Sequence, residues 1–128
     1  STRPARDAER FLEQHNLGEL FALCVTQETT RRLKPHPQPV AYAARALGVA
    51  PSECVMVGDT PADMRSGRRA GAWRIGVLCG FGEQKELWDT GADQVVSSTA
   101  DILSLVTSEV DQQGSCSRVG EITLGVWW

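Results

Sequence analysis

The sequence predicts an α/β fold, in which a parallel sheet carries helices on both of its faces. Short continuous apolar runs, such as residues 54–57, are typical of strands that are covered on both sides. These runs alternate along the chain with stretches in which apolar residues recur every three or four positions, the spacing of an amphipathic helix. Alternation of this kind indicates a parallel sheet with crossover helices.

The first half of the chain contains two predicted helices and one predicted strand. Residues 4–16 have apolar side chains at helical spacing, and Gly18 follows their end. Residues 21–25 form a continuous apolar run, which predicts the first buried strand. The second helix is predicted at residues 39–47 and ends at Gly48.

The second half continues the alternation of strand and helix. Strands are predicted at residues 54–57, 73–79 and 94–96, and helices at residues 61–70, 83–88 and 98–106. The strand at 94–96 is short, and we expect it at the edge of the sheet. Ser98 or Thr99 is the expected cap of the last helix, with Asp101 in its first turn.

Length and composition indicate one globular domain followed by a tail. The chain has 128 residues, of which 41% are hydrophobic and 23% charged, the composition of a folded domain. We assign residues 1–106 to this domain. Residues 107–128 differ in character and end in Trp127 and Trp128, two side chains that would be sticky if exposed. The tail is therefore expected to be a strand docked on another surface, or an altered terminus.

Charge and cysteine usage exclude several classes of protein. The net charge is -3, without a block of like charge, so no surface for nucleic acid or anionic lipid is expected. The densest basic group, Arg65, Arg68 and Arg69, is expected to face solvent. The four cysteines stand singly and lack zinc spacing. Without a signal peptide or a long apolar segment, a cytoplasmic protein with no membrane contact is expected.

Two carboxylates follow the predicted strand at residues 54–57. Asp59 and Asp63 lie four residues apart, where the strand gives way to a helix, and Gly58 lets the backbone approach a ligand there. Asp59 can coordinate Mg²⁺ directly, while Asp63 can reach the ion or orient its waters. In the alternative interpretation, Asp59 caps the helix and Asp63 adds charge to its first turn.

A lysine upstream strengthens the ligand-binding interpretation. Lys34 precedes Pro35 and Pro37, which stiffen the backbone, and its ammonium group can neutralise a phosphoryl group. His36 lies in the same turn as a possible acid or base, but a solvent-facing position is favoured.

These segments resemble the third and fourth motifs of the haloacid dehalogenase-like hydrolases. The matching segments are Lys34-Pro35-His36-Pro37 and Val57-Gly58-Asp59-Thr60-Pro61-Ala62-Asp63-Met64. Outside the motifs the chain is similar to the phosphoglycolate phosphatase-like branch of that family, in the segments Ala70-Gly71-Ala72-Trp73, Gly80-Phe81-Gly82 and Gly91-Ala92-Asp93. The resemblance covers residues 1–106.

The resemblance implies a Rossmann-like sheet and a Mg²⁺-dependent phosphatase acting on a small phosphorylated metabolite. In this scheme an aspartate attacks phosphorus, and the phosphoaspartyl intermediate is then hydrolysed. The resemblance assigns Lys34 to steadying the nucleophile and the phosphate, and Asp59 and Asp63 to holding Mg²⁺. The family's second motif binds phosphate through a Ser or Thr hydroxyl at a strand end. Ser1 is the better match to that position and Thr2 the next.

The chain departs from the family at the first motif. That motif, Asp-x-Asp, supplies the nucleophile and the acid, and it occurs nowhere in this sequence. The cap region that selects the substrate is absent as well. We therefore expect the carboxyl-terminal portion of a phosphatase, truncated and inactive alone. Residues 21–25 and 54–57 would then flank a gap left by missing central strands, with unpaired edges.

Two other functions are compatible with parts of the sequence. A non-catalytic protein could bind a protein partner at exposed strand edges and through Trp127 and Trp128. A nucleotide-binding domain would use Gly76, Gly80 and Gly82, but their spacing misses the dinucleotide-binding fingerprint.

Overall fold

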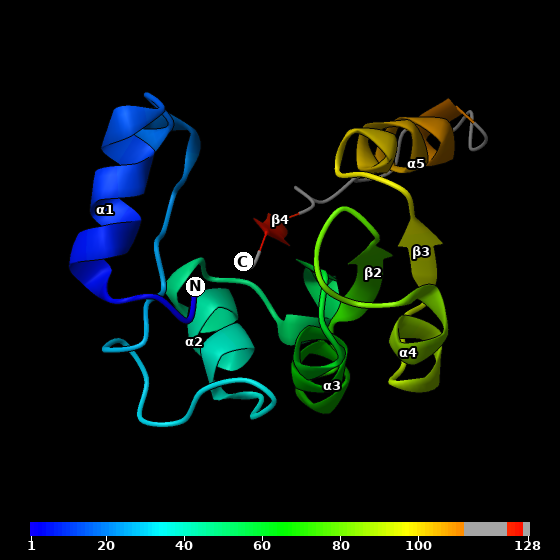
Figure 1. Ribbon diagram of the computed structural model, residues 1–128, viewed down its shortest axis with the longest axis horizontal. Coiled ribbons are helices and arrows are strands. Elements are labelled where there is room, and N and C mark those ends of the chain that lie inside the picture. Colours follow the sequence, from blue (N-terminus) through cyan, green and yellow to red (C-terminus); the bar gives the residue numbers. More distant parts are fainter. Residues whose placement is uncertain (112–122, 127–128) are drawn as a thin grey trace.

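A computed structural model describes residues 1–111 and 123–126 of the chain. Its four strands form one sheet in the order β3-β2-β1-β4, and every neighbouring pair is parallel. The strands are β1 (Cys54–Gly58), β2 (Trp73–Val77), β3 (Gln94–Val96) and β4 (Thr123–Val126). The helices are α1 (Ala5–Gln14), α2 (Gln38–Ala46), α3 (Pro61–Ala70), α4 (Gln84–Asp89) and α5 (Ala100–Asp111), with short 3-10 turns at Gly18–Leu20 and Pro51–Glu53. The predicted α/β class is confirmed (Figure 1).

Helices cover both faces of the sheet, as predicted. One face packs on α2 and α3 through a buried cluster of Val25, Val40, Ala44, Cys54, Met56 and Ala72. The opposite face packs on α5 through Val57, Ile75, Val77 and Ile102. Figure 1 shows α2, α3 and α4 along one side of the strands and α5 on the other. Because successive strand residues point to opposite faces, Met56 and Val57 belong to different clusters.

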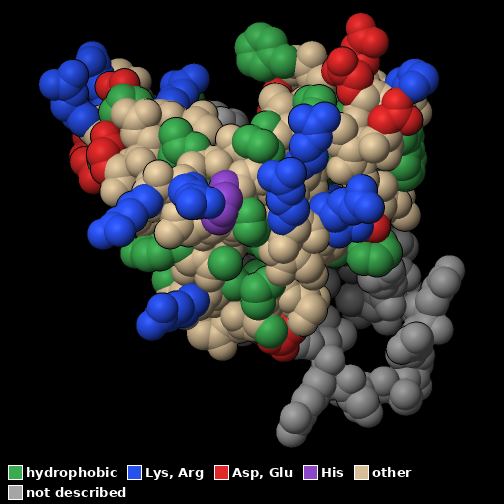
Figure 2. Space-filling model, turned by 90° about the horizontal axis from the view of Figure 1, so that it is seen from below, with side chains coloured by type: hydrophobic (Ala, Val, Ile, Leu, Met, Phe, Trp, Pro, Cys, Tyr) green, Lys and Arg blue, Asp and Glu red, His purple; other side chains and the backbone are tan. Residues whose placement is uncertain are grey.

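Exposed arginines lie on the side of the molecule formed by these three helices. Arg65, Arg68 and Arg69 are all exposed on α3, as predicted. Figure 2 views this side and shows Lys and Arg side chains at its surface. Within the part of the chain that the structure describes, no helix is long and apolar enough to cross a membrane.

Helix α3 has the bounds predicted from the sequence because both of its ends carry strong local signals. Thr60 accepts a hydrogen bond from the backbone N–H of Asp63, and Pro61 occupies the first turn, where a missing N–H costs little. At the other end Gly71 has a φ of 87°, the left-handed conformation that glycine adopts without strain.

The predicted strand at residues 21–25 is wrong. The segment does not join the sheet, and its carboxyl end lies beside residues 1–3: Val25 accepts a hydrogen bond from the nitrogen of Ser1, and the backbone N–H of Gln27 donates to the Arg3 carbonyl. Val25 is buried, whereas Phe21 is exposed. Phe21, Ala22 and Cys24 are exposed, so the run is neither paired in the sheet nor covered on both faces.

The edge of β1 that the sequence predicts to be unpaired is paired with β4. The register runs from Cys54 opposite Thr123 to Val57 opposite Val126. For residues 123–126, the expectation of a docked strand is thus confirmed; residues 112–122, Trp127 and Trp128 lie outside the described residues. Helix α5 extends to Asp111, beyond the predicted end at residue 106. Of its two candidate caps, Ser98 contacts Asp101 through its N–H and its hydroxyl, at 2.9 and 3.1 Å from Oδ2.

Candidate active site

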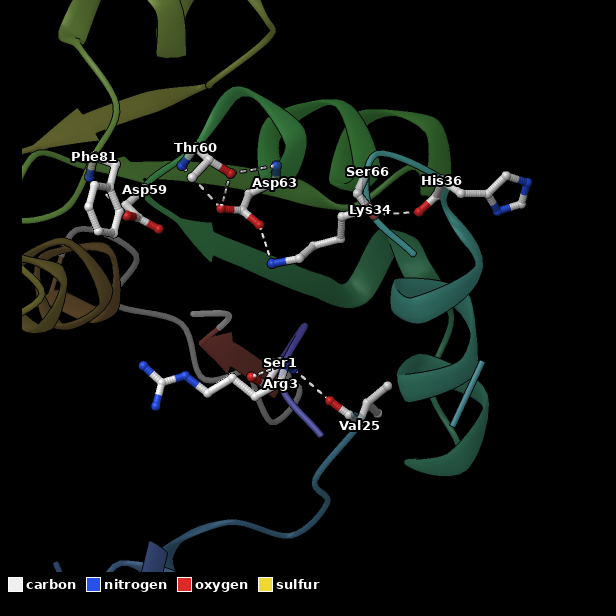
Figure 3. A network of polar contacts seen from close by, with 10 residues as sticks. All are labelled: Ser1, Arg3, Val25, Lys34, His36, Asp59, Thr60, Asp63, Ser66 and Phe81. Atoms are coloured by element: carbon white, nitrogen blue, oxygen red, sulfur yellow. Dashed lines mark hydrogen bonds and ion pairs between the residues drawn. The ribbon is translucent and has the colours of Figure 1, made fainter. Parts of the chain in front are cut away.

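The candidate site lies at the carboxyl end of β1, where the chain turns into α3. Parallel strands bring their carboxyl ends to one edge of the sheet, and Gly58 of β1 is paired with Gly76 of β2. Asp59 follows β1 directly, and Asp63 lies in the first turn of α3. Lys34 reaches this edge from the turn that precedes α2 (Figure 3).

Lys34 and Asp63 form a buried ion pair between Nζ and Oδ1. The Lys34 side chain is 7% exposed and that of Asp63 is 1% exposed. A charge in such surroundings is costly unless it is paired and hydrogen-bonded, so each residue requires the other. The structure therefore brings together two of the site residues that the sequence places 29 positions apart.

The second carboxylate oxygen of Asp63 is held by Thr60. The backbone N–H of Thr60 donates to Asp63 Oδ2 at 3.1 Å, and the Thr60 hydroxyl donates to the same oxygen at 2.7 Å. In return, Asp63 N lies 3.3 Å from Thr60 Oγ1. This reciprocal arrangement is a capping box, so Thr60 caps α3, and not Asp59. The spacing of Thr60 and Asp63 is the sequence signal that would have identified the cap.

Asp59 is held from the loop that follows β2. The backbone N–H of Phe81 donates to Asp59 Oδ2 at 3.0 Å. Gly80 and Gly82, on either side of Phe81, lie so close to Asp59 that no side chain fits at either position. Gly76 in turn lies close to Leu87. The absence of a side chain at these three glycines thus allows other parts of the protein to pack closely against the backbone. For Oδ1 of Asp59, no hydrogen-bond partner is found among residues 1–111 and 123–126.

Helix α3 also anchors the backbone of the Lys34 turn. The hydroxyl of Ser66, which is fully buried, donates to the His36 carbonyl at 2.7 Å. An Arg69 guanidinium nitrogen donates to the Pro35 carbonyl at 3.1 Å. Sequence reasoning missed Ser66; its only signal is the spacing of three from Asp63, which places both on one face of α3.

His36 takes no part in the site. Its ring points away from Asp63 and Lys34 (Figure 3), and Nδ1 accepts a hydrogen bond from the backbone of Gln38 at 3.1 Å. The side chain is half-buried, less open than the predicted solvent-facing position.

Ser1 lies opposite Lys34 and Asp63, beneath the end of β1 in Figure 3. Its nitrogen donates to the Val25 carbonyl at 2.6 Å, and its hydroxyl accepts from the backbone of Arg3 at 3.1 Å. Thr2, the second candidate for phosphate binding, is exposed.

The two aspartates suit a hard cation that keeps several of its waters. The described residues include no group of three or more His, Cys, Asp or Glu that could enclose a metal ion. Mg²⁺ needs fewer: it commonly takes one or two carboxylates, and substrate phosphate completes its shell. Gly58 makes room for the Asp63 side chain, because a Cβ at position 58 would lie 2.3 Å from Asp63 Cβ. Since both oxygens of Asp63 have partners, Asp59 is the better direct ligand.

Comparison with known proteins assigns the family. The sequence profile of the haloacid dehalogenase-like hydrolases matches residues 1–77. The chain belongs to this family. The chain is 34% identical over 98 residues to pyrophosphatase PpaX of Bacillus pumilus. The matched region covers 77% of this chain and 45% of the relative. It is 33% identical over 106 residues to a phosphoglycolate phosphatase of Chromobacterium violaceum, covering 83% of the chain and 46% of the relative.

Solved structures of hydrolases share the fold. A family hydrolase from Deinococcus radiodurans with bound phosphate and sodium superimposes with a TM-score of 0.74 at 27% identity. A hydrolase from Pseudomonas syringae gives a TM-score of 0.77 at 28% identity. Each comparison covers 84% of this chain and 50% of the solved chain. The chain spans about half the length of the curated relatives it matches.

Proposed function

We propose that this chain supplies the phosphate- and Mg²⁺-binding part of a phosphoric monoester hydrolase that acts on a small phosphorylated metabolite. The observation that carries the proposal is the buried Lys34–Asp63 ion pair beside Asp59 at the carboxyl end of β1. The phosphatase names among the relatives support it. A lysine and two carboxylates at one strand end match the charge pattern of a phosphate bound together with a divalent cation.

Each residue has a role that follows from its surroundings. Asp63 fixes the ammonium group of Lys34, which then faces a phosphoryl group as a preorganised positive charge. Asp59 would be the direct protein ligand of Mg²⁺, with Asp63 beside it. Bound Mg²⁺ would neutralise charge on the phosphate oxygens. Ser1, and next Thr2, would bind phosphate through a hydroxyl group.

The 128-residue sequence contains no Asp-x-Asp motif. We therefore propose that the chain binds Mg²⁺ and phosphate but does not hydrolyse phosphate monoesters alone, because no carboxylate is assigned to attack phosphorus. A reducing, cytoplasmic setting fits the free thiols of Cys24, Cys54 and Cys79.

Calorimetric titration of the chain with MgCl₂ and inorganic phosphate tests the proposal. Phosphate should bind more tightly when Mg²⁺ is present, and Asp59→Asn and Lys34→Met should each weaken this binding at least about tenfold. Asp89→Asn is the matched control, because Asp89 lies in an exposed ion pair on α4. Equal binding by all four proteins, or no binding by any, would reject the site.

Activity can be tested in a chimera. The corresponding part of pyrophosphatase PpaX is replaced by this chain, and hydrolysis of p-nitrophenyl phosphate is measured with Mg²⁺. The chimera should be active and its Lys34→Met variant inactive, whereas the chain alone should show no turnover.

The structure gives less support to a non-catalytic binding protein. That hypothesis places a protein partner beside β1, but β4 occupies this position, and among the described strands the outer edges of the sheet are those of β3 and β4. A partner at this position would have to displace β4.

A further inference from the structure

The loop between β2 and α4 crosses the carboxyl end of β1 and contacts Asp59 through its backbone. The N–H of Phe81 lies 3.0 Å from Asp59 Oδ2, although the two residues are 22 positions apart. The Phe81 side chain is 95% exposed. The backbone amide thus serves the site, while the aromatic ring is left in solvent.

Two glycines make this approach possible. A Cβ at Gly80 would lie 1.9 Å from Asp59 Oδ2 and 2.5 Å from its Cγ. A Cβ at Gly82 would lie 2.2 Å from the Asp59 carbonyl oxygen. These separations are far below van der Waals contact, and the atoms in the way belong to a short side chain and to the backbone. A side chain at either glycine must therefore displace Asp59 or the loop that contacts it.

The loop is held at both of its ends. Near its start, the N–H of Leu78 donates to the Val96 carbonyl of β3 at 3.0 Å. Near its end, the loop lies against the fully buried Leu87 of α4, since a Cβ at Gly82 would lie 3.2 Å from Leu87 Cδ2. The Phe81 amide is consequently fixed before any ligand binds, which is the condition for preorganised support of a binding group.

We propose that the segment Gly80–Phe81–Gly82 is a positioning element for Asp59: the Phe81 amide engages Oδ2 and so directs Oδ1 toward a divalent cation. This inference rests on the proposed function, because it names the support for the carboxylate that would bind Mg²⁺. The capping box of Thr60 and the Lys34 ammonium play the same part for Asp63, so the two carboxylates have separate supports.

Titration of the full 128-residue chain with Mn²⁺, followed by electron paramagnetic resonance, tests the inference without turnover. Gly80→Ala and Gly82→Ala should each weaken Mn²⁺ binding by about tenfold or more, the usual effect of losing an outer-shell partner. Gly18→Ala is the matched control, since a Cβ at Gly18 meets nothing within 4 Å, and its binding should equal that of the wild type.

A second measurement does not depend on the glycine variants being folded. Hydrogen exchange of the Phe81 amide is compared by NMR between the wild type and Asp59→Ala, in the absence of metal. Removing a charged acceptor should speed exchange by about tenfold. An unchanged rate would show that Asp59 does not hold this amide and would overturn the inference.

The outcomes separate this inference from the function on which it rests. If the wild type binds Mn²⁺ and the folded Gly80→Ala and Gly82→Ala proteins bind it equally well, the positioning role is wrong and the proposed metal site stands. If the wild type does not bind Mn²⁺, the metal site is wrong and the positioning role falls with it.

Discussion

Lys34 is paired with Asp63, a residue that also holds the cap of α3, so one carboxylate joins the phosphate-facing turn to the helix beside it. The same helix contacts the turn twice more, through Ser66 and Arg69. The arrangement of the site and the stability of the fold therefore depend on a shared set of polar contacts.

Breaking the buried ion pair should strongly destabilise the protein. Lys34→Met leaves the Asp63 carboxylate without its cation, and Asp63→Asn leaves the ammonium group without its anion. Each should lower the free energy of unfolding by about 3 kcal/mol. The double variant should cost less than the two single changes together, by about 1 kcal/mol or more. Urea denaturation of the four proteins measures the difference, and strict additivity would contradict the pair.

An exposed ion pair supplies the control for that experiment. Lys85 and Asp89 lie one turn apart on α4, with side chains that are 84% and 61% exposed. Lys85→Met should leave the urea midpoint unchanged within error, because solvent screens such a pair.

Thr60 should matter through its hydroxyl group. Thr60→Ala removes the group that contacts both Asp63 Oδ2 and the Asp63 N–H. The expected loss is about 1 kcal/mol of unfolding free energy, the usual cost of an N-cap. Thr60→Ser keeps the hydroxyl and should lose much less. Equal thermal denaturation midpoints for the two variants would show that the methyl group, and not the cap, is important.

Gly58 should tolerate no side chain. A Cβ there would lie 2.6 Å from both Cγ and Oδ2 of Asp63, so alanine must displace the carboxylate or the end of β1. We expect Gly58→Ala to cost about 2 kcal/mol and to weaken phosphate binding as well. Gly18→Ala again serves as the control. A Gly58→Ala protein as stable as the wild type would mean that the crowding is relieved without cost.

The Cys54 thiol should resist alkylation, and stability should fall at high pH. Burial, and then the charge of Glu53, raises the pKa of this thiol above its ordinary value of 9.0. As the pH rises above 9.0, the unfolded chain therefore loses this proton before the native state does. Because the unfolded chain then binds fewer protons than the native state, the free energy of unfolding falls as the pH rises. Cys54→Ala should reduce this loss of stability between pH 9 and pH 10.

Mass spectrometry after iodoacetamide treatment of the native protein should find Cys24 and Cys79, which are exposed, labelled before Cys54.

Local signals account for the elements that the sequence predicted well. Thr60, Pro61 and Gly71 mark the ends of α3, and both of its predicted bounds are confirmed. The strand at Gln94–Val96 and its place at the end of the sheet were likewise predicted. Such signals act over a few residues, so they are readable without knowledge of the fold.

Pairing between distant segments could not be predicted in the same way. The apolar run at residues 21–25 predicts a buried strand, but Phe21, Ala22 and Cys24 are exposed, and a run of this kind does not indicate which strand, if any, lies beside it. The partner of β1 lies in the tail, where composition alone offers no register. In the site, the sequence motifs predicted Lys34, Asp59 and Asp63. The Phe81 amide was missed, because a backbone N–H is present at every residue except proline and carries no signature.

The pairing of β4 with β1 has a consequence for how the chain acquires its structure. β1 and β2 are separated by one helix, whereas β1 and β4 lie about 70 positions apart, so closing the second ladder has the larger entropic cost. We therefore expect β1 to form its ladder with β2 first during folding and to present its other edge to the surroundings until β4 pairs with it. In that interval an identical chain can add its own strand there, so refolding yield should fall as protein concentration rises.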